Sequence, residues 1–64
     1  MRIELSHKAK ELGIIRVELF ERDGEPGAWS VEAYDNDGSI FQTIFYGNES
    51  GDRAAEYAKF KYGG

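Results

Sequence analysis

Alternating apolar and polar residues predict three consecutive β-strands in the middle of the chain. The alternation runs from about residue 14 to 22 and again from about 28 to 35, which is typical of strands with one buried face. Asp-Gly and Pro-Gly pairs separate the first two segments, and Asp-Asn-Asp-Gly at residues 35–38 separates the second from the third. Glycine accepts the positive φ angles of tight turns, so these connections predict an antiparallel meander whose third strand covers about 39–46.

The third predicted strand carries bulky apolar side chains on both faces. Successive side chains of a strand point to opposite sides of the sheet. One side is lined by Ile40, Ile44 and Tyr46, and the other is lined by Phe41 and Phe45. Because a single helix can shield only one side of a small sheet, the pattern predicts a second apolar face that needs a cover of its own.

The residues after the meander predict a C-terminal helix over about 51–62. Ser50 is a suitable N-cap, and Asp52 places negative charge in the first turn, where the helix dipole favours it. Gly63 can end the helix in the left-handed conformation. Alternation over 58–62 would also fit a short strand, but the alanines favour a helix. The stripe expected to face the sheet comprises Ala54, Ala55, Tyr57, Ala58 and Tyr62.

The first thirteen residues allow two interpretations. Leu5, Ala9 and Leu12 recur at helical spacing, which predicts a short helix over about 6–12. Residues 2–5 alone would instead suit a short additional strand. The apolar residues of this segment can also fold over the second face of the sheet, which is the alternative to a partner there. These residues are Ile3, Leu5 and Leu12.

Size and composition narrow the fold class and the possible functions. The 64 residues make a single domain, 1–64, and its segments together predict the α+β class. The chain has no cysteine and one histidine, which excludes disulfides and thiolate metal sites. No apolar run reaches the roughly 20 residues of a membrane span, and the N-terminus lacks a signal-peptide pattern. We therefore expect a soluble, cytoplasmic protein without a membrane partner.

Charge and motif content disfavour nucleic-acid binding and catalysis. Twelve acidic and eight basic side chains give a formal net charge of −4, whereas phosphate backbones are bound by lysine and arginine. His7 has no Ser, Cys or Asp at a catalytic spacing, and the turn at 35–38 lacks the glutamate that completes a calcium loop. We predict a non-enzymatic protein with no catalytic, cofactor-binding or metal-binding residue.

The second face of the sheet is the predicted functional surface, because exposed apolar patches usually mark binding sites. The residues expected beneath the helix are Ile15, Val17, Leu19, Trp29, Val31 and Ala33. The residues expected to contact a partner are Phe20, Tyr34, Phe41 and Phe45, with Glu18 and Glu32 setting charge complementarity.

These features favour a small protein–protein interaction protein or regulatory accessory protein. Its partner would be another protein or a second copy of the chain, which would give a homodimer. An acidic inhibitor or decoy, which blocks a nucleic-acid-binding site, is one form of this hypothesis, since net negative charge favours a basic partner.

The predicted topology also resembles modules that bind nucleic acids. Three antiparallel strands followed by an alanine-rich helix, over 14–63, resemble the DNA-binding modules of plant ethylene-response factors and the arm-binding domains of phage-type integrases. With the N-terminal helix, the order is similar to that of double-stranded-RNA-binding domains. The resemblance implies an alternative function, in which the sheet reads nucleic acid through Arg16, Arg22, Tyr34 and Phe41.

A second resemblance concerns the terminal Gly63-Gly64. It is similar to the tail of ubiquitin-like sulfur-carrier proteins, in which a C-terminal diglycine is activated as an acyl adenylate, and it implies a diglycine carrier as a further alternative. Those proteins have a helix between their second and third strands, where this chain has a short turn. Likeness at the level of topology does not carry function, and no family is assigned from either resemblance.

Overall fold

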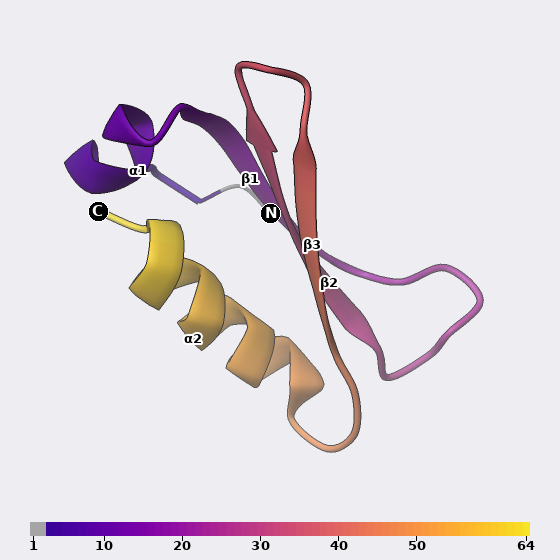
Figure 1. The fold of residues 1–64 in the computed structure, drawn as a ribbon. Coiled ribbons are helices and arrows are strands. Elements are labelled where there is room, and N and C mark those ends of the chain that lie inside the picture. Colours follow the sequence, from indigo (N-terminus) through magenta and orange to yellow (C-terminus); the bar gives the residue numbers. More distant parts are fainter. Residues whose placement is uncertain (1–2) are drawn as a thin grey trace.

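The computed structural model describes residues 3–64 and confirms the predicted α+β fold (Figure 1). A short helix and three strands are followed by a longer helix, and each element lies within one or two residues of its predicted bounds. In chain order they are α1 (His7–Glu11), β1 (Ile14–Glu21), β2 (Trp29–Asp35), β3 (Ile40–Phe45) and α2 (Ser50–Tyr62).

The three strands form one antiparallel sheet in the order β1-β2-β3, with β2 in the centre. Cross-strand partners point to the same side of a sheet, so the register divides the side chains between two faces. The face toward α2, here called the covered face, carries Val17, Leu19, Trp29, Val31, Ala33, Phe41, Thr43 and Phe45. The opposite face, here called the open face, carries Arg16, Glu18, Phe20, Ser30, Glu32, Tyr34, Ile40, Gln42 and Ile44.

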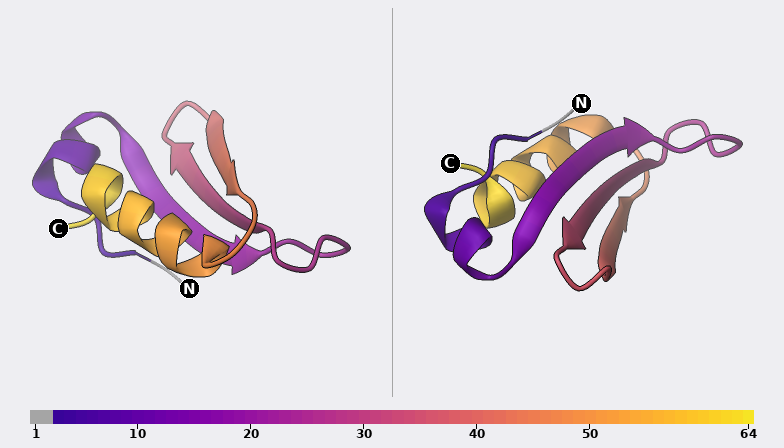
Figure 2. Two further views of the ribbon diagram at one scale, coloured as in Figure 1. Left: turned by 90° about the horizontal axis from the view of Figure 1, so that it is seen from below. Right: turned by 90° about the horizontal axis from the view of Figure 1, so that it is seen from above.

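Helix α2 packs on the covered face through its smallest side chains. Ala54 and Ala58 are fully buried, and Tyr62 closes the same stripe one turn later. Small residues let the helix backbone approach the sheet closely, so that Val17 and Val31 are only 1% exposed. Both helices lie on this side of the sheet in every view (Figures 1 and 2), and no element of residues 3–64 lies over the open face.

The N-terminal segment closes the edge of the covered layer rather than the open face. The Ile3 amide donates to the Val17 carbonyl at 3.3 Å, and Leu5 forms an isolated antiparallel bridge with Gly63. Ile3 and Leu5 pack against the core, whereas Leu12 is 72% exposed. The predicted short helix is confirmed as α1. Of the alternative strand at 2–5, residues 3–5 form only the isolated bridge at Leu5, and Arg2 lies outside the described residues.

A bulge at the start of β1 makes the expected placement of Ile15 wrong. The register with β2 shifts between Ile14 and Arg16, so one residue of β1 has no partner opposite it. As a result Ile14 is buried at 7% exposure, while Ile15 is 64% exposed. Simple alternation assigns Ile15 to the core, and the extra residue reverses that assignment.

The ends of α2 also differ from the expected caps. The N-cap is Glu49, in the left-handed conformation with φ 60° and no side-chain capping bond, and Ser50 is the first helical residue. The Ser50 hydroxyl instead donates to the Gly27 carbonyl at 2.6 Å, which ties the helix start to the β1–β2 loop. Gly63 is extended rather than left-handed, because it pairs with Leu5 in the bridge.

Candidate functional site

A hydrogen-bonded polar network crosses all three strands in the middle of the open face. The Arg16 guanidinium lies 3.0 Å from a Glu18 carboxylate oxygen and 4.2 Å from the centre of the Tyr34 ring. The Tyr34 hydroxyl donates to one oxygen of Glu32 at 2.7 Å, and the Gln42 amide donates to the other at 2.5 Å. Each strand therefore contributes to one connected network.

Within this network the cation lies next to a carboxylate, and most of the polar side-chain groups bond to one another. Glu32 accepts from Tyr34 and Gln42, and Glu18 faces the Arg16 cation. The hydrogen bond to Glu32 raises the pKa of Tyr34, since ionising the phenol would remove the donated proton. Side chains that are held by one another present a fixed hydrogen-bonding surface, which lowers the entropy lost when a partner binds.

One end of the open face is apolar and encloses a buried serine. Ser30 is fully buried although it points away from α2, because Phe20 and Ile44 flank it in the register. Its hydroxyl accepts from Arg22 at 3.0 Å, and that arginine also contacts Glu25 at 2.6 Å. Two residues after Ile44, the alternation places the Tyr46 side chain, 58% exposed, on this same face.

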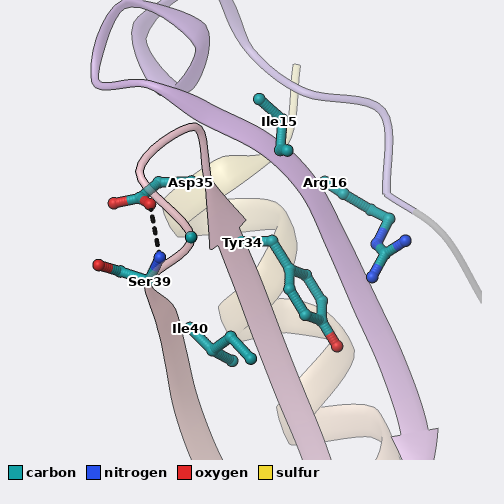
Figure 3. Close-up of a pocket in the computed structure, with 7 residues that line it drawn as sticks. Ile15, Arg16, Tyr34, Asp35, Ser39 and Ile40 are labelled. Carbon is teal, nitrogen blue, oxygen red and sulfur yellow. Dashed lines mark hydrogen bonds between the residues drawn. The ribbon is translucent and has the colours of Figure 1, made fainter.

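The other end of the open face contains a shallow hollow of about 350 Å³ (Figure 3). Figure 3 shows Tyr34 of β2 between Arg16 of β1 and Ile40 of β3. Asp35 shapes the turn that forms one wall, because its carboxylate accepts from the Ser39 amide at 2.9 Å. Ile15 and Ile40 line the hollow and are 64% and 58% exposed. The hollow could therefore receive an apolar side chain next to the Arg16 cation.

The structure divides the predicted contact residues between the two faces. It brings together four of them on the open face, which are Phe20, Tyr34, Glu18 and Glu32. Phe41 and Phe45 lie on the covered face, opposite Ala33 and Trp29. The centres of the Phe45 ring and the Tyr57 ring of α2 lie 5.4 Å apart. Phe41 is half exposed and lines a hollow with Lys61 and Tyr62 in the last turn of α2.

Ile40, Gln42 and Ile44 of β3, with Tyr46 just after the strand, are the open-face residues that the sequence-based prediction missed. The signal that identifies them is the length of the β2–β3 turn. Asp35 pairs with Ser39, since the Asp35 amide donates to the Ser39 carbonyl at 3.1 Å. One residue farther from the turn on each strand, Tyr34 therefore pairs with Ile40. This pairing places the even-numbered residues of β3 on the open face.

Chemistry-bearing residues are sparse over residues 3–64. His7 is exposed on α1, where its ring lies 3.4 Å from the Glu11 carboxylate. In this part of the chain no three His, Cys, Asp or Glu side chains are grouped in a way that could hold a metal ion. Neither of its two helices combines the length and the apolar composition that crossing a membrane requires. No family model, curated protein or solved structure matches the chain.

Proposed function

We propose that the chain is a non-enzymatic interaction domain that binds another protein through the open face. The observation that carries this proposal is the composition of a face that no described element covers. Apolar side chains stand at both of its ends, and a pre-arranged polar network lies between them. Protein interfaces combine these parts, with aromatic residues enriched in the contact region and hydrogen bonds distributed around them.

A protein partner fits this face better than a nucleic acid. Arg16 on the open face pairs with Glu18, and Arg22, which follows β1 and bonds to the open-face Ser30, pairs with Glu25. Phosphate binding draws its affinity from lysines and arginines that release counterions, and paired cations contribute less to it. Phe41, which the nucleic-acid alternative also requires, lies on the covered face.

The arrangement also describes the partner. It would offer an apolar side chain to the hollow beside Ile40, a second apolar group to the end at Phe20, and hydrogen-bonding groups between them. An amphipathic segment lying across the strands meets these requirements. A regulatory role in the cytoplasm remains the expectation. The decoy form of the hypothesis would use the loop at 21–25, which has three acidic residues and one arginine, more than the open face, where Arg16 pairs with Glu18.

The diglycine alternative has no specific structural observation in its favour. Gly63 and Gly64 are both tied to the N-terminal segment, through the bridge to Leu5 and a hydrogen bond from the Gly64 amide to the Glu4 carbonyl at 3.0 Å. The connection between β2 and β3 is the short turn described above.

Site-specific photo-crosslinking tests the proposed surface. Benzoylphenylalanine replaces Phe20 on the open face, or Phe60, which is 91% exposed on α2, as the matched control. We expect one protein from an extract of the source cells to be crosslinked from position 20 and not from position 60. Identical crosslinking from both positions would contradict the proposal.

The crosslinked protein is then purified, and its affinity for variants is measured by calorimetry. Ile15→Lys places a charge in the hollow, and we expect it to weaken binding at least about tenfold, or about 1.4 kcal/mol. The control Phe60→Lys should change affinity less than about twofold. Equal effects of the two variants would exclude the open face as the binding surface.

Measuring binding to duplex DNA and RNA at several salt concentrations distinguishes the nucleic-acid alternative from the proposed protein-binding function. We expect no measurable affinity even at low salt, where contacts to phosphates are strongest. Tight binding at low salt that weakens steeply as salt is added would favour the nucleic-acid module instead.

A further inference from the structure

The outer edge of β3 is the most exposed backbone edge of the sheet. The other edge strand, β1, is met by the N-terminal segment at Val17, whereas no described element lies beside β3. Exposed edges are ready templates for a further strand, because half of their backbone groups point outward. The edge of β3 therefore has a binding capacity that is distinct from that of the open face.

The register identifies the backbone groups that point outward. In an antiparallel pair, hydrogen-bonded and non-hydrogen-bonded residue pairs alternate. The Asp35 amide donates to Ser39, which makes their pair a hydrogen-bonded one, so Phe41, Thr43 and Phe45 also direct their backbone groups toward β2. The amides and carbonyls of Ile40, Gln42 and Ile44 consequently face away from the sheet.

This edge lacks the features that usually prevent strand addition. Natural edge strands carry lysine, proline or bulges that discourage pairing with another chain. Residues 40–46 contain no charged residue, no proline and no glycine, and the register of β3 with β2 is unbroken. Exposed apolar side chains occur on both sides of the strand, at Ile40 and Tyr46 on one and Phe41 on the other.

We propose that β3 pairs with β3 of a second copy, in an antiparallel arrangement about a two-fold axis, to form a continuous sheet across the dimer. An antiparallel edge is complementary to its own copy, since the two-fold axis brings each outward amide of one strand opposite an outward carbonyl of the other. The uncharged segment 40–46 lets the two copies approach without repulsion, although each chain carries a net charge of −4.

Charges at the ends of the strand support this occupant. Antiparallel pairing brings the β2–β3 turn of one copy, with Asp37, to the far end of β3 in the other. At that end Arg53 donates to the Tyr46 carbonyl at 3.2 Å and lies 5.7 Å from the centre of the Phe45 ring. The symmetric dimer therefore places an acidic turn near a basic side chain twice, once on each side of the axis.

The length of the β3 edge predicts a weak dimer. A strand of six residues is about 20 Å long, so one edge-to-edge contact lies at the small end of specific interfaces. We expect a dimer that forms reversibly with rising concentration. This inference does not depend on the proposed function, because it uses the backbone edge of β3, whereas the residues that test the proposed function, Phe20 and Ile15, lie on β1 at the other edge of the sheet.

Sedimentation velocity combined with amide hydrogen exchange tests the proposal. The wild-type chain should shift from monomer to dimer as its concentration rises from about micromolar to about millimolar. In parallel, exchange of the Ile40, Gln42 and Ile44 amides should slow at least about tenfold, while Phe41 and Thr43, already bonded to β2, change little. A chain that stays monomeric throughout, or a dimer that leaves those three amides unprotected, would overturn it.

Two variants keep the result independent of folding defects. Gln42→Pro removes an outward backbone amide at a position where edge strands tolerate proline, and with it the side-chain bond to Glu32, which Gln42→Ala removes alone as a matched control. Ile40→Lys adds a charge to the edge without altering any backbone bond. Gln42→Pro and Ile40→Lys should each abolish dimerisation, and the controls Gln42→Ala and Phe60→Lys should preserve it. Dimerisation retained by a folded Ile40→Lys variant would exclude β3 as the interface.

Discussion

The two faces of the sheet are built from alternate residues of the same strands, yet they achieve order in different ways. On the covered face, Val17, Val31 and Ala33 are at most 1% exposed and pack against the alanines of α2. On the open face, Glu32 and Tyr34 remain partly exposed and bond to each other. One face is ordered by excluding water, and the other by hydrogen bonds and ion pairs between neighbouring side chains.

This difference separates the source of stability from the surface available for binding. Burying a large apolar side chain contributes about 1.5–3 kcal/mol, whereas an exposed ion pair contributes about 0–1 kcal/mol. A chain of this length has little stability to lose, so nearly all of it must come from the covered face. Residues of the open face are correspondingly free to vary with little loss of stability, as the proposed binding role requires.

The largest expected contrast comes from truncating one residue of β1 on each side. Leu19→Ala leaves a cavity beneath α2 and should lower the free energy of unfolding by about 2–5 kcal/mol. The matched change Ile15→Ala, at a residue that is 64% exposed, should stay within about 0.5 kcal/mol. Urea denaturation measures both values. Similar losses would show that the open face is as important for stability as the covered one.

The second largest loss of stability is expected at the bridge between Gly63, after α2, and Leu5 of the N-terminal segment. A Cβ at Gly63 would stand 2.7 Å from the Lys59 carbonyl oxygen, which is backbone and cannot turn aside. Gly63→Ala should therefore shift the chain end, weaken the bridge to Leu5 and lower stability by about 1–3 kcal/mol.

Gly64→Ala is its control, since the nearest atom to a Cβ there is the Leu5 oxygen at 3.3 Å, a contact that a small shift of the last residue relieves. Thermal unfolding of both variants should show the larger loss at Gly63. The reverse order would mean that the end of the chain does not help to close the covered layer.

A smaller effect is expected where α2 meets the β1–β2 loop. Ser50→Ala removes the hydroxyl that donates to the Gly27 carbonyl, and buried hydrogen bonds of this kind contribute about 0.5–1.5 kcal/mol. Ser39→Ala should be neutral within about 0.5 kcal/mol, because Ser39 bonds through its backbone in the exposed turn. Chemical denaturation distinguishes them, and equal values would contradict a tertiary role for Ser50.

Local patterns were sufficient to predict the fold of this chain. The alternation in each strand, the Asp-Asn-Asp-Gly turn and the alanine stripe of α2 each specify one structure, and they agree with one another. Where a prediction failed, a tertiary contact had changed the local preference. The β1 bulge exposes Ile15, the loop carbonyl of Gly27 takes the Ser50 hydroxyl, and Leu5 holds Gly63 in an extended conformation.

The candidate site was only partly predictable. Alternation identified two sets of apolar residues on β3 but did not say which set faces α2. That choice depends on the pairing of Asp35 with Ser39 in the turn, because a slip of one residue exchanges the faces of the whole strand. The polar network depends on the lateral alignment of Arg16, Tyr34 and Glu32, which alternation alone does not fix.

The smallest expected effects concern two tyrosines whose pKa values are raised for different reasons. On the open face, the hydrogen bond to Glu32 raises the pKa of Tyr34; in α2, burial against the core raises the pKa of Tyr62. Glu32→Gln should therefore lower the pKa of Tyr34 toward its ordinary value and leave that of Tyr62 unchanged. Titration of the tyrosine rings by NMR measures both, and a parallel fall in the two values would contradict separate causes.

Burial of Tyr62 also makes stability depend on pH in the alkaline range. Its folded pKa is raised, so the unfolded phenol, with an ordinary pKa of 10.0, ionises first. The stabilisation is thus complete below pH 10 and is lost as pH rises from there through the folded pKa. The lowered pKa of Tyr57, caused mainly by the hydrogen bond from Thr43, acts in the opposite direction. Tyr62→Phe should therefore lose less stability than the wild type between pH 9 and 11 in urea denaturation, whereas an unchanged loss would assign the alkaline sensitivity to other groups.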